Sequence, residues 1–376
     1  MMYVNDDQAG AWLLQLLRFM VLAMVVAVLP ACGEDLTAEQ HLEKAREFLA
    51  EEKLFEGIIE LKNALQKEGN LPEARWLMGE AYLKLGNGAL ANREFTSARS
   101  LGYSHEDMDL YVFRALNLQG KYQEVLNKTD SLVASDNSAA LQVIRGDAFL
   151  GLRQNEAAGE AYREAIAMDA NTAAAYSGLA RLALGSRDME QSQSFIDRGL
   201  AVDPENDDLL MLKGLLHLIQ NEAAEAEKYF SQASEAAPYN RMAKIGLIRA
   251  RYAQGKFDEA LPPLKTLESR YGNAPTVKYL RAYFEYQAKN VEKAKELLAD
   301  VLKTMPSHPE SLLLLSNILY QDGKLEQVID YMERFTSQFP NHLPAVKLLA
   351  VAYLGQKETD KTIELIQDAL ETNTAD

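Results

Sequence analysis

The sequence predicts an all-α solenoid, a stack of helix–turn–helix repeats that extends along one dimension. A segment of about 34 residues recurs along nearly the whole chain, and its clearest copies begin at Pro72, Ala139 and Asp207. A segment of this size cannot bury its apolar face alone, so it stacks on its neighbours and presents a long surface. The hydrophobic content of 48% is sufficient for one continuous core along the stack. Such surfaces bind other molecules far more often than they catalyse reactions.

About ten repeats account for the chain from Ala38 to Asp376, each with a first helix, a turn and a second helix. The predicted repeats start near Ala38, Pro72, Glu106, Ala139, Ala173, Asp207, Arg241, Pro275, Pro309 and Leu343. Glycine before lysine indicates the turn inside a repeat, as at Gly120, Gly255 and Gly323. Proline, which cannot continue the helical hydrogen-bond ladder, ends second helices at Pro204, Pro238, Pro306 and Pro340.

The repeats resemble the tetratricopeptide repeat (TPR), whose pattern sets a small residue in the first helix against an aromatic residue in the second. The second repeat carries this pattern at Gly79, Tyr82, Ala91, Phe95 and Ala98. The fourth repeat carries it at Gly146, Phe149, Ala158, Tyr162 and Ala165. The sixth repeat carries it at Gly214, Ala226, Phe230, Ala233 and Pro238, with His217 in place of the tyrosine. The third repeat is the poorest copy, with Phe113 at the small position and Thr129 at the aromatic one. The resemblance implies a right-handed superhelix.

The N-terminus predicts a signal peptide over residues 1–31. A run of about eleven apolar residues, Phe19 to Leu29, follows Arg18 and is too short to span a membrane comfortably. Ala31 then precedes Cys32, which resembles the bacterial lipobox, where the cysteine thiol receives diacylglycerol. The alternatives are an ordinary cleaved signal and a structural cysteine. We expect Cys32 to be lipidated, residues 32–37 to form a short tether and residues 38–376 to form the solenoid. Gly33 after the cysteine favours the periplasmic face of the outer membrane.

A closer resemblance covers residues 32–95, which look like the start of the TPR-repeat lipoproteins of the PEP-CTERM system. That family accompanies exosortase and exopolysaccharide genes in Gram-negative bacteria. Its members carry more repeats, so this chain looks short or truncated. The last predicted helix presents Ile363, Ile366 and Leu370 at helical spacing with nothing after it to cover them. We therefore expect the tenth repeat to be frayed, to be covered by a partner, or to continue in a longer polypeptide.

Composition and motifs narrow the function further. The net charge of −16 and the pI of about 4.9 argue against nucleic acid as a partner. Cys32 is the only cysteine, so no intramolecular disulfide and no cysteine-rich metal site is possible. The five histidines lie at no metal-ligand spacing, and no phosphate loop or catalytic motif appears. The sequence therefore predicts no enzyme, no cofactor and no metal site.

The TPR resemblance places candidate binding residues at positions 2, 5, 9, 12 and 13 of each first helix, which line the concave groove of the family. The lysine and asparagine with which the chaperone-binding subclass reads a peptide carboxylate are absent here. Repeats seven to nine instead hold Arg249, Tyr252, Tyr279, Tyr283, Tyr286, Asn317 and Tyr320. Tyr279, Tyr283 and Tyr286 share one helical face, and tyrosine suits both extended peptides and sugar rings. The alternative is that these rings only pack against adjacent helices.

Three functions follow as hypotheses. The leading one is a lipid-anchored periplasmic scaffold that recruits protein partners of an envelope system, with exosortase sorting or exopolysaccharide export as the implied setting. The second is a carbohydrate-binding module that contacts the exopolysaccharide through the tyrosines. The third is an assembly scaffold for pilus or secretion machinery. Membrane contact is expected only through the lipid anchor.

Overall fold

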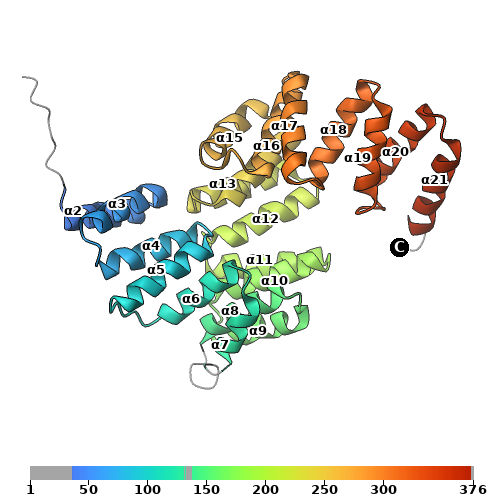
Figure 1. Ribbon diagram of the computed structural model, residues 1–376. Coiled ribbons are helices and arrows are strands. Elements are labelled where there is room, and N and C mark those ends of the chain that lie inside the picture. The colour runs from blue at the N-terminus through green and yellow to red at the C-terminus, as the bar shows by residue number, and fades with distance from the viewer. Residues whose placement is uncertain (1–35, 131, 133–137, 374–376) are drawn as a thin grey trace, which may run out of the picture. The chain divides into compact units, whose positions relative to one another are not determined.

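The computed structural model describes residues 36–130, 132 and 138–373. The described residues form helices joined by turns and contain no strand; the helices are labelled α2 to α21 (Figure 1). The chain divides into two compact bodies, one up to Gln119 and one from Gly120 onward. We call them the N-terminal body and the C-terminal body. The predicted all-α TPR solenoid is confirmed.

The N-terminal body contains two complete repeats and the first helix of a third. Its helices are α2 (Ala38–Ala50), α3 (Leu54–Lys67), α4 (Pro72–Lys84), α5 (Gly88–Ser100) and α6 (Met108–Leu118). The two helices of each complete repeat pack against each other, and each repeat also contacts the next. Cys32 and the predicted signal peptide lie outside the described residues.

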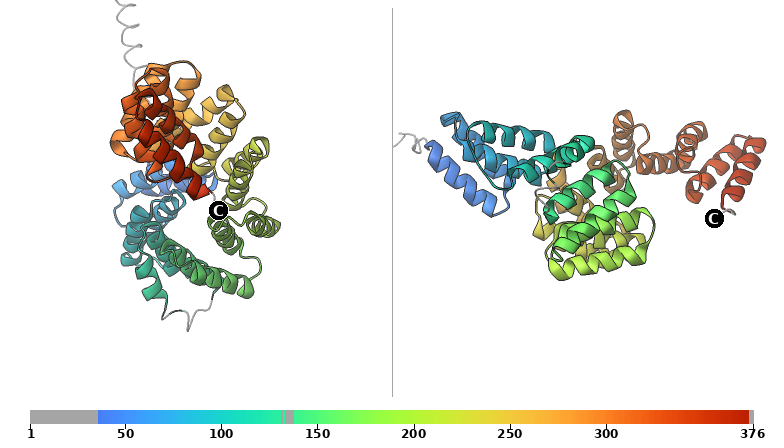
Figure 2. Two further views of the ribbon diagram at one scale, coloured as in Figure 1. Left: turned by 90° about the vertical axis from the view of Figure 1, so that its right-hand side faces the viewer. Right: turned by 90° about the horizontal axis from the view of Figure 1, so that it is seen from below.

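The C-terminal body begins with the second helix of the third repeat and contains seven further repeats. Its first helices are α8 (Ala139–Gly151), α10 (Ala173–Gly185), α12 (Asp207–Ile219), α14 (Arg241–Ala253), α16 (Pro275–Gln287), α18 (Pro309–Gln321) and α20 (Leu343–Gly355). Its second helices are α7 (Tyr122–Thr129), α9 (Asn155–Met168), α11 (Met189–Val202), α13 (Ala223–Ala236), α15 (Phe257–Tyr271), α17 (Val291–Thr304), α19 (Leu325–Thr336) and α21 (Thr359–Asn373). Figure 2 shows the two helices of a repeat lying side by side, as for α20 and α21.

Small residues and aromatic rings lock the repeats together. A Cβ added to Gly79 would lie 2.5 Å from the ring of Phe95, and one added to Gly146 would lie 2.6 Å from Tyr162. The ring of Tyr162 also faces Gly178 of the following repeat, where an added Cβ would lie 2.3 Å away. The Tyr162 ring therefore fills the space that glycine leaves in its own repeat and in the next, which fixes the distance between these two first helices.

The third repeat differs from the others. Its first helix, α6, ends the N-terminal body, and its second helix, α7, spans only Tyr122–Thr129. Thr129 is buried at the aromatic position, where its hydroxyl accepts a hydrogen bond from Arg145 Nη1 (2.8 Å). A short polar side chain replaces the large ring here, so the sequence departure coincides with the division of the chain.

Helix α15 contains two internal prolines, Pro262 and Pro263. Pro263 has no N–H to donate to the carbonyl of Glu259, one turn earlier. Arg251 Nη1 donates to that carbonyl instead, at 2.7 Å. A side chain from α14 thus replaces the missing backbone donor, so the helix runs through both prolines.

The last helix, α21, leaves apolar side chains in contact with solvent. Ile363, Ile366 and Leu370 are 51%, 43% and 60% exposed. Among the described residues, no helix combines the length and apolar character needed to cross a membrane.

Candidate docking face

The first helices of the C-terminal body form a layer of their own. Contacts join α10 to α12, α12 to α14, α16 to α18 and α18 to α20, although a second helix intervenes in sequence each time. We call the side chains at positions 2, 5, 9, 12 and 13 of the first helices in this body the first-helix face. These are the positions at which the TPR resemblance predicts binding residues.

Large apolar side chains lie exposed on this face in two groups. Leu215, Ile219 and Met242 come from the contacting helices α12 and α14. Tyr320, Val351 and Leu354 come from the contacting helices α18 and α20. Leu354 is 53% exposed and Met242 is 52% exposed, whereas Ala352 and Ala243 on the same helices are fully buried. Clustered apolar exposure of this kind marks an interaction surface more often than scattered single residues do.

The predicted tyrosines form a chain of rings between the two groups. Tyr252 of α14 lies 5.2 Å from Tyr283 of α16, and Tyr279 lies 6.4 Å from Tyr283 and 5.5 Å from His308. Tyr252 is 8% exposed, and its hydroxyl donates to the carbonyl of Leu280 at 3.0 Å. Burial raises the pKa of both Tyr252 and Tyr279. Tyr252 therefore packs against adjacent helices, which is the alternative to a binding role for this residue.

The other predicted residues of this region keep more contact with solvent. Tyr279, Tyr283 and Tyr286 are partly buried against neighbouring helices, and the hydroxyl of Tyr286 accepts from Gln321 Nε2 at 3.3 Å. Asn317 is exposed, and its Nδ2 donates to the carbonyl of Leu313, one turn earlier, at 2.8 Å. Tyr320 is exposed on the same helix. Asn317 and Tyr320 thus present polar and aromatic groups to solvent.

An ion pair crosses the face beside Tyr279. Arg249 Nη2 lies 2.9 Å from Glu310 Oε1, and the two residues belong to the seventh and ninth repeats. Both charges act on Tyr279: its pKa is raised first by burial and then by Glu310, and Arg249 opposes the shift. The same two charges act on His308, whose pKa is lowered by burial and by Arg249 while Glu310 opposes this. Arg249, Tyr279, His308 and Glu310 are therefore one electrostatic cluster built from three repeats.

Sequence reasoning identified Arg249 and Tyr279 in this cluster but missed Glu310. Glu310 lies at position 2 of its repeat, one of the positions considered, so its register was the available signal. The apolar residues Leu215, Met242, Val351 and Leu354 were missed in the same way. Carboxylates are numerous in this chain, and only the structure shows which one meets an arginine.

In the N-terminal body, neighbouring side chains contact several first-helix residues at positions 5 and 9. Trp76, at position 5, is 3% exposed, because Tyr103 and His105 stack on it at ring distances of 5.3 and 4.6 Å. Glu80, at position 9, is partly buried beside Tyr111, and burial raises its pKa. Arg46 donates to both carboxylate oxygens of Glu73 at 2.8–3.0 Å. Exposed large apolar side chains of this body include Ile59 of the second helix α3, at 57%, and Leu118 at the end of α6, at 50%.

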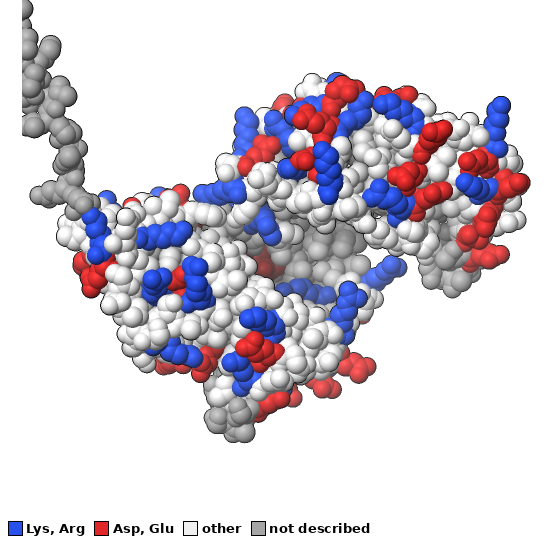
Figure 3. Space-filling model, in the orientation of Figure 1, with Lys and Arg blue, Asp and Glu red and all other residues white. Residues whose placement is uncertain are grey.

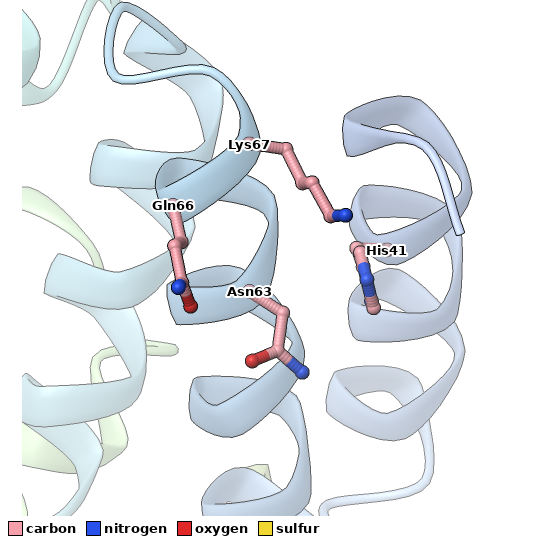
Figure 4. Close-up of a pocket in the computed structure, with 4 residues that line it drawn as sticks. All are labelled: His41, Asn63, Gln66 and Lys67. Carbon is pink, nitrogen blue, oxygen red and sulfur yellow. The ribbon is translucent and has the colours of Figure 1, made fainter. Parts of the chain in front are cut away.

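Two cavities lie away from the first-helix face. The first, of about 520 Å³, is lined by His41 of α2 and by Asn63, Gln66 and Lys67 of α3 (Figure 4). The His41 Nδ1 atom already meets Glu60 Oε2 at 2.5 Å. The second cavity, of about 320 Å³, lies between the end of α19 and helices α20 and α21. In the lining of the second cavity, the Tyr353 hydroxyl donates to Glu333 Oε1 at 2.6 Å. The described residues contain no group of acids, histidines and cysteines arranged for a metal.

The visible surface carries both charges in mixture. Lys and Arg alternate with Asp and Glu over the face shown in Figure 3, with no continuous basic stripe.

Comparison with known proteins finds repeat proteins. A tetratricopeptide repeat family model matches residues 149–216 and 217–283, and the model of anaphase-promoting complex (cyclosome) subunit 3 matches residues 287–369. The chain is 23% identical over 258 residues to the TPR repeat-containing protein MJ1428 of Methanocaldococcus jannaschii, covering 66% of this chain and 41% of that protein. It is 26% identical over 151 residues to tetratricopeptide repeat protein 21B of Mus musculus, covering 38% of this chain and 12% of that protein.

A solved structure shares the fold over most of the chain. The crystal structure of the APC/C hetero-tetramer Cut9-Hcn1 matches with a TM-score of 0.64 at 12% identity, covering 84% of this chain and 67% of that one. Residues 149–283 of this chain are thus similar to the tetratricopeptide repeat family, and the fold is that of a solved TPR-like structure. It spans less than half the length of the two curated relatives.

Proposed function

We propose that this protein is a docking scaffold that holds a segment of a partner protein against the first-helix face of its C-terminal body. The observation that carries the proposal is the exposure of six large apolar side chains at the face positions: Leu215, Ile219, Met242, Tyr320, Val351 and Leu354. Binding scaffolds expose such groups because their burial against a partner is favourable. TPR proteins generally bind protein partners and are generally not enzymes, which agrees with this assignment.

We further propose that the scaffold works in a Gram-negative envelope, anchored through a lipid on Cys32 and facing the periplasm. The lipobox-like sequence and the resemblance of residues 32–95 to PEP-CTERM-system lipoproteins support this setting. Exosortase sorting or exopolysaccharide export is the process it favours, and pilus or secretion assembly is the alternative. Cys32→Ser should release the protein from the membrane fraction or block its processing. Unchanged fractionation of that variant would contradict the anchor.

Site-specific photo-crosslinking in the native cell tests the docking face. A photoreactive amino acid at Leu354 or Leu215 should give protein adducts, because these positions would contact the partner. The matched control is Met305, which is similarly exposed at 46% but follows the second helix α17. Equal adducts from Leu354 and Met305 would contradict a specific docking face. Adducts that contain carbohydrate and no protein would favour the exopolysaccharide-binding alternative.

A further inference from the structure

We propose that Glu310 is an intramolecular placeholder on Arg249, and that the segment bound by the first-helix face displaces it with a carboxylate of its own. The preferred partner segment then carries Asp or Glu beside apolar side chains. This inference rests on the proposed docking function, because it states which segment the face accepts.

The geometry of the ion pair suits displacement. The side chains of Arg249 and Glu310 are 43% and 39% exposed, and they meet through one short contact, Nη2 to Oε1. Exposed ion pairs of this kind contribute little to stability, so the fold does not depend on keeping this one. A guanidinium offers five N–H donors and binds a carboxylate best through two of them. Arg249 therefore has donor capacity that Glu310 does not use.

A homologous position in the N-terminal body shows the contrasting arrangement. Arg46 and Glu73 occupy the same repeat positions, 9 and 2, in adjacent repeats. Arg46 holds both oxygens of Glu73 and also meets Glu43 Oε2 at 2.5 Å. Its donors are filled from several directions, so this pair is built as a structural tie. The Arg249–Glu310 pair instead joins repeats seven and nine across the intervening first helix α16.

The charge of α14 favours an anionic partner. The helix carries Arg241, Lys244, Arg249 and Arg251 and no acidic residue, in a chain whose net charge is −16. Arg251 is held by Glu227 at 2.9 Å, whereas Lys244 donates to the carbonyl of Pro238. Burial and then the nearby Arg270 lower the pKa of Lys244. Arg249 is the cation of α14 that meets a carboxylate of another first helix, Glu310.

Apolar side chains flank the cation on both sides along the layer of first helices. Met242 precedes Arg249 on α14, and Leu215 and Ile219 lie on the contacting helix α12. Tyr320 lies beyond Glu310 on α18. Between α12 and α18, a segment that follows this face meets apolar surface, the Arg249 cation and apolar surface again. That order specifies an acidic residue between apolar ones.

The test uses two fluorescein-labelled peptides of twelve residues, in which leucine alternates with serine and one central position is Glu or Gln. Binding to the full chain is measured by fluorescence anisotropy at low and at high salt. The Glu peptide should bind about fivefold more tightly than the Gln peptide, and salt should reduce the difference. Glu310→Gln should tighten the Glu peptide by a further factor of about three to ten, because the competing carboxylate is gone. Arg249→Gln should abolish the preference, and Arg249→Lys should restore part of it.

Glu73→Gln is the matched control, because it removes the equivalent carboxylate from the structural tie and should leave both affinities unchanged. Circular dichroism should show wild-type helicity for all variants. If both peptides bind wild type equally and Glu310→Gln changes neither, the placeholder is overturned while the docking face stands. If neither peptide binds wild type or Glu310→Gln, the docking function itself fails. If alginate, an anionic polysaccharide, displaces the Glu peptide through Arg249 and binds more tightly, the protein segment is the wrong occupant.

Discussion

At the scale of single residues, the turn inside each repeat imposes one unusual backbone conformation. Ten residues have positive φ between their two helices, and they recur at the repeat spacing: Glu52, Gly86, Gly120, Arg153, Arg187, Asn221, Gly255, Lys289, Gly323 and Lys357. Glycine adopts this left-handed conformation freely, whereas a side chain costs about 1–2 kcal/mol there. Four repeats have glycine at this position and one has asparagine. In the other five repeats, a residue with a longer side chain adopts the left-handed conformation, and its backbone is strained.

Replacing one of the strained residues with glycine should stabilise the protein. Lys289 has a φ of 67° and is exposed after α16. Lys289→Gly should increase the free energy of unfolding by about 0.5–1 kcal/mol, because relief of the left-handed strain exceeds the entropy that glycine adds to the unfolded chain. The urea midpoint measures this. Gly255→Ala should shift the midpoint the other way, and Lys293→Gly, inside α17, should also lower it. A lower midpoint for Lys289→Gly would show that the lysine side chain stabilises the turn.

At the scale of helices, two consecutive first helices begin with a histidine cap. His308 Nδ1 accepts from the N–H of Ser311 at 3.3 Å, and His342 Nδ1 accepts from the N–H of Ala345 at 3.2 Å. Only a neutral imidazole has this acceptor. A protonated ring would instead present a donor and a positive charge to the helix N-terminus, where both are unfavourable. The helices α18 and α20 therefore depend on neutral histidine.

The stability of this region should fall in mild acid. Burial holds the folded-state pKa of His308 below its ordinary value of 6.5, with Arg249 lowering it further and Glu310 opposing. Because the folded state binds the proton less readily, the stabilisation is present above about pH 6.5 and is lost as pH falls through the lower folded-state pKa. His308→Asn, which retains a cap acceptor at every pH, should show a smaller decrease in urea midpoint between pH 7.5 and pH 5. His217→Asn, at a histidine that caps no helix, is the control. An identical pH response in His308→Asn and wild type would contradict the cap mechanism.

The helices themselves could be predicted because the repeat pattern is local physics. Nine of the first helices begin at the residues from which the repeats were counted, and the third begins two residues later, at Met108. Glycine opposite an aromatic ring and proline after a second helix act over short distances along the chain. The sequence of each repeat therefore indicates where its own helices begin and end. The contacts of the candidate site join different repeats instead. Whether Arg249 contacts Glu310 depends on how α14, α16 and α18 are stacked. The sequence pattern within one repeat does not predict this stacking.

At the scale of the whole molecule, stability depends on contacts between neighbouring repeats. Each internal repeat is covered on both sides, whereas a terminal repeat is covered on one. In the C-terminal body the central repeats bury Phe230 and Leu264, while α21 leaves Ile363, Ile366 and Leu370 exposed. Protection from hydrogen exchange should therefore decline from the central repeats toward residues 343–373.

Substitution of the exposed residues of α21 provides the sharper test. Ile363→Lys, Ile366→Lys and Leu370→Lys together should change the urea midpoint of the monomer little, because these side chains are largely in water already. Leu349→Lys, at a position that is 2% exposed on α20, should destabilise the C-terminal body by at least about 3 kcal/mol, because it buries a charge in the core. If the triple variant also loses association at high concentration, the exposed side of α21 is covered by another chain. If it lowers the midpoint of the monomer as strongly as Leu349→Lys, the three side chains pack inside the fold.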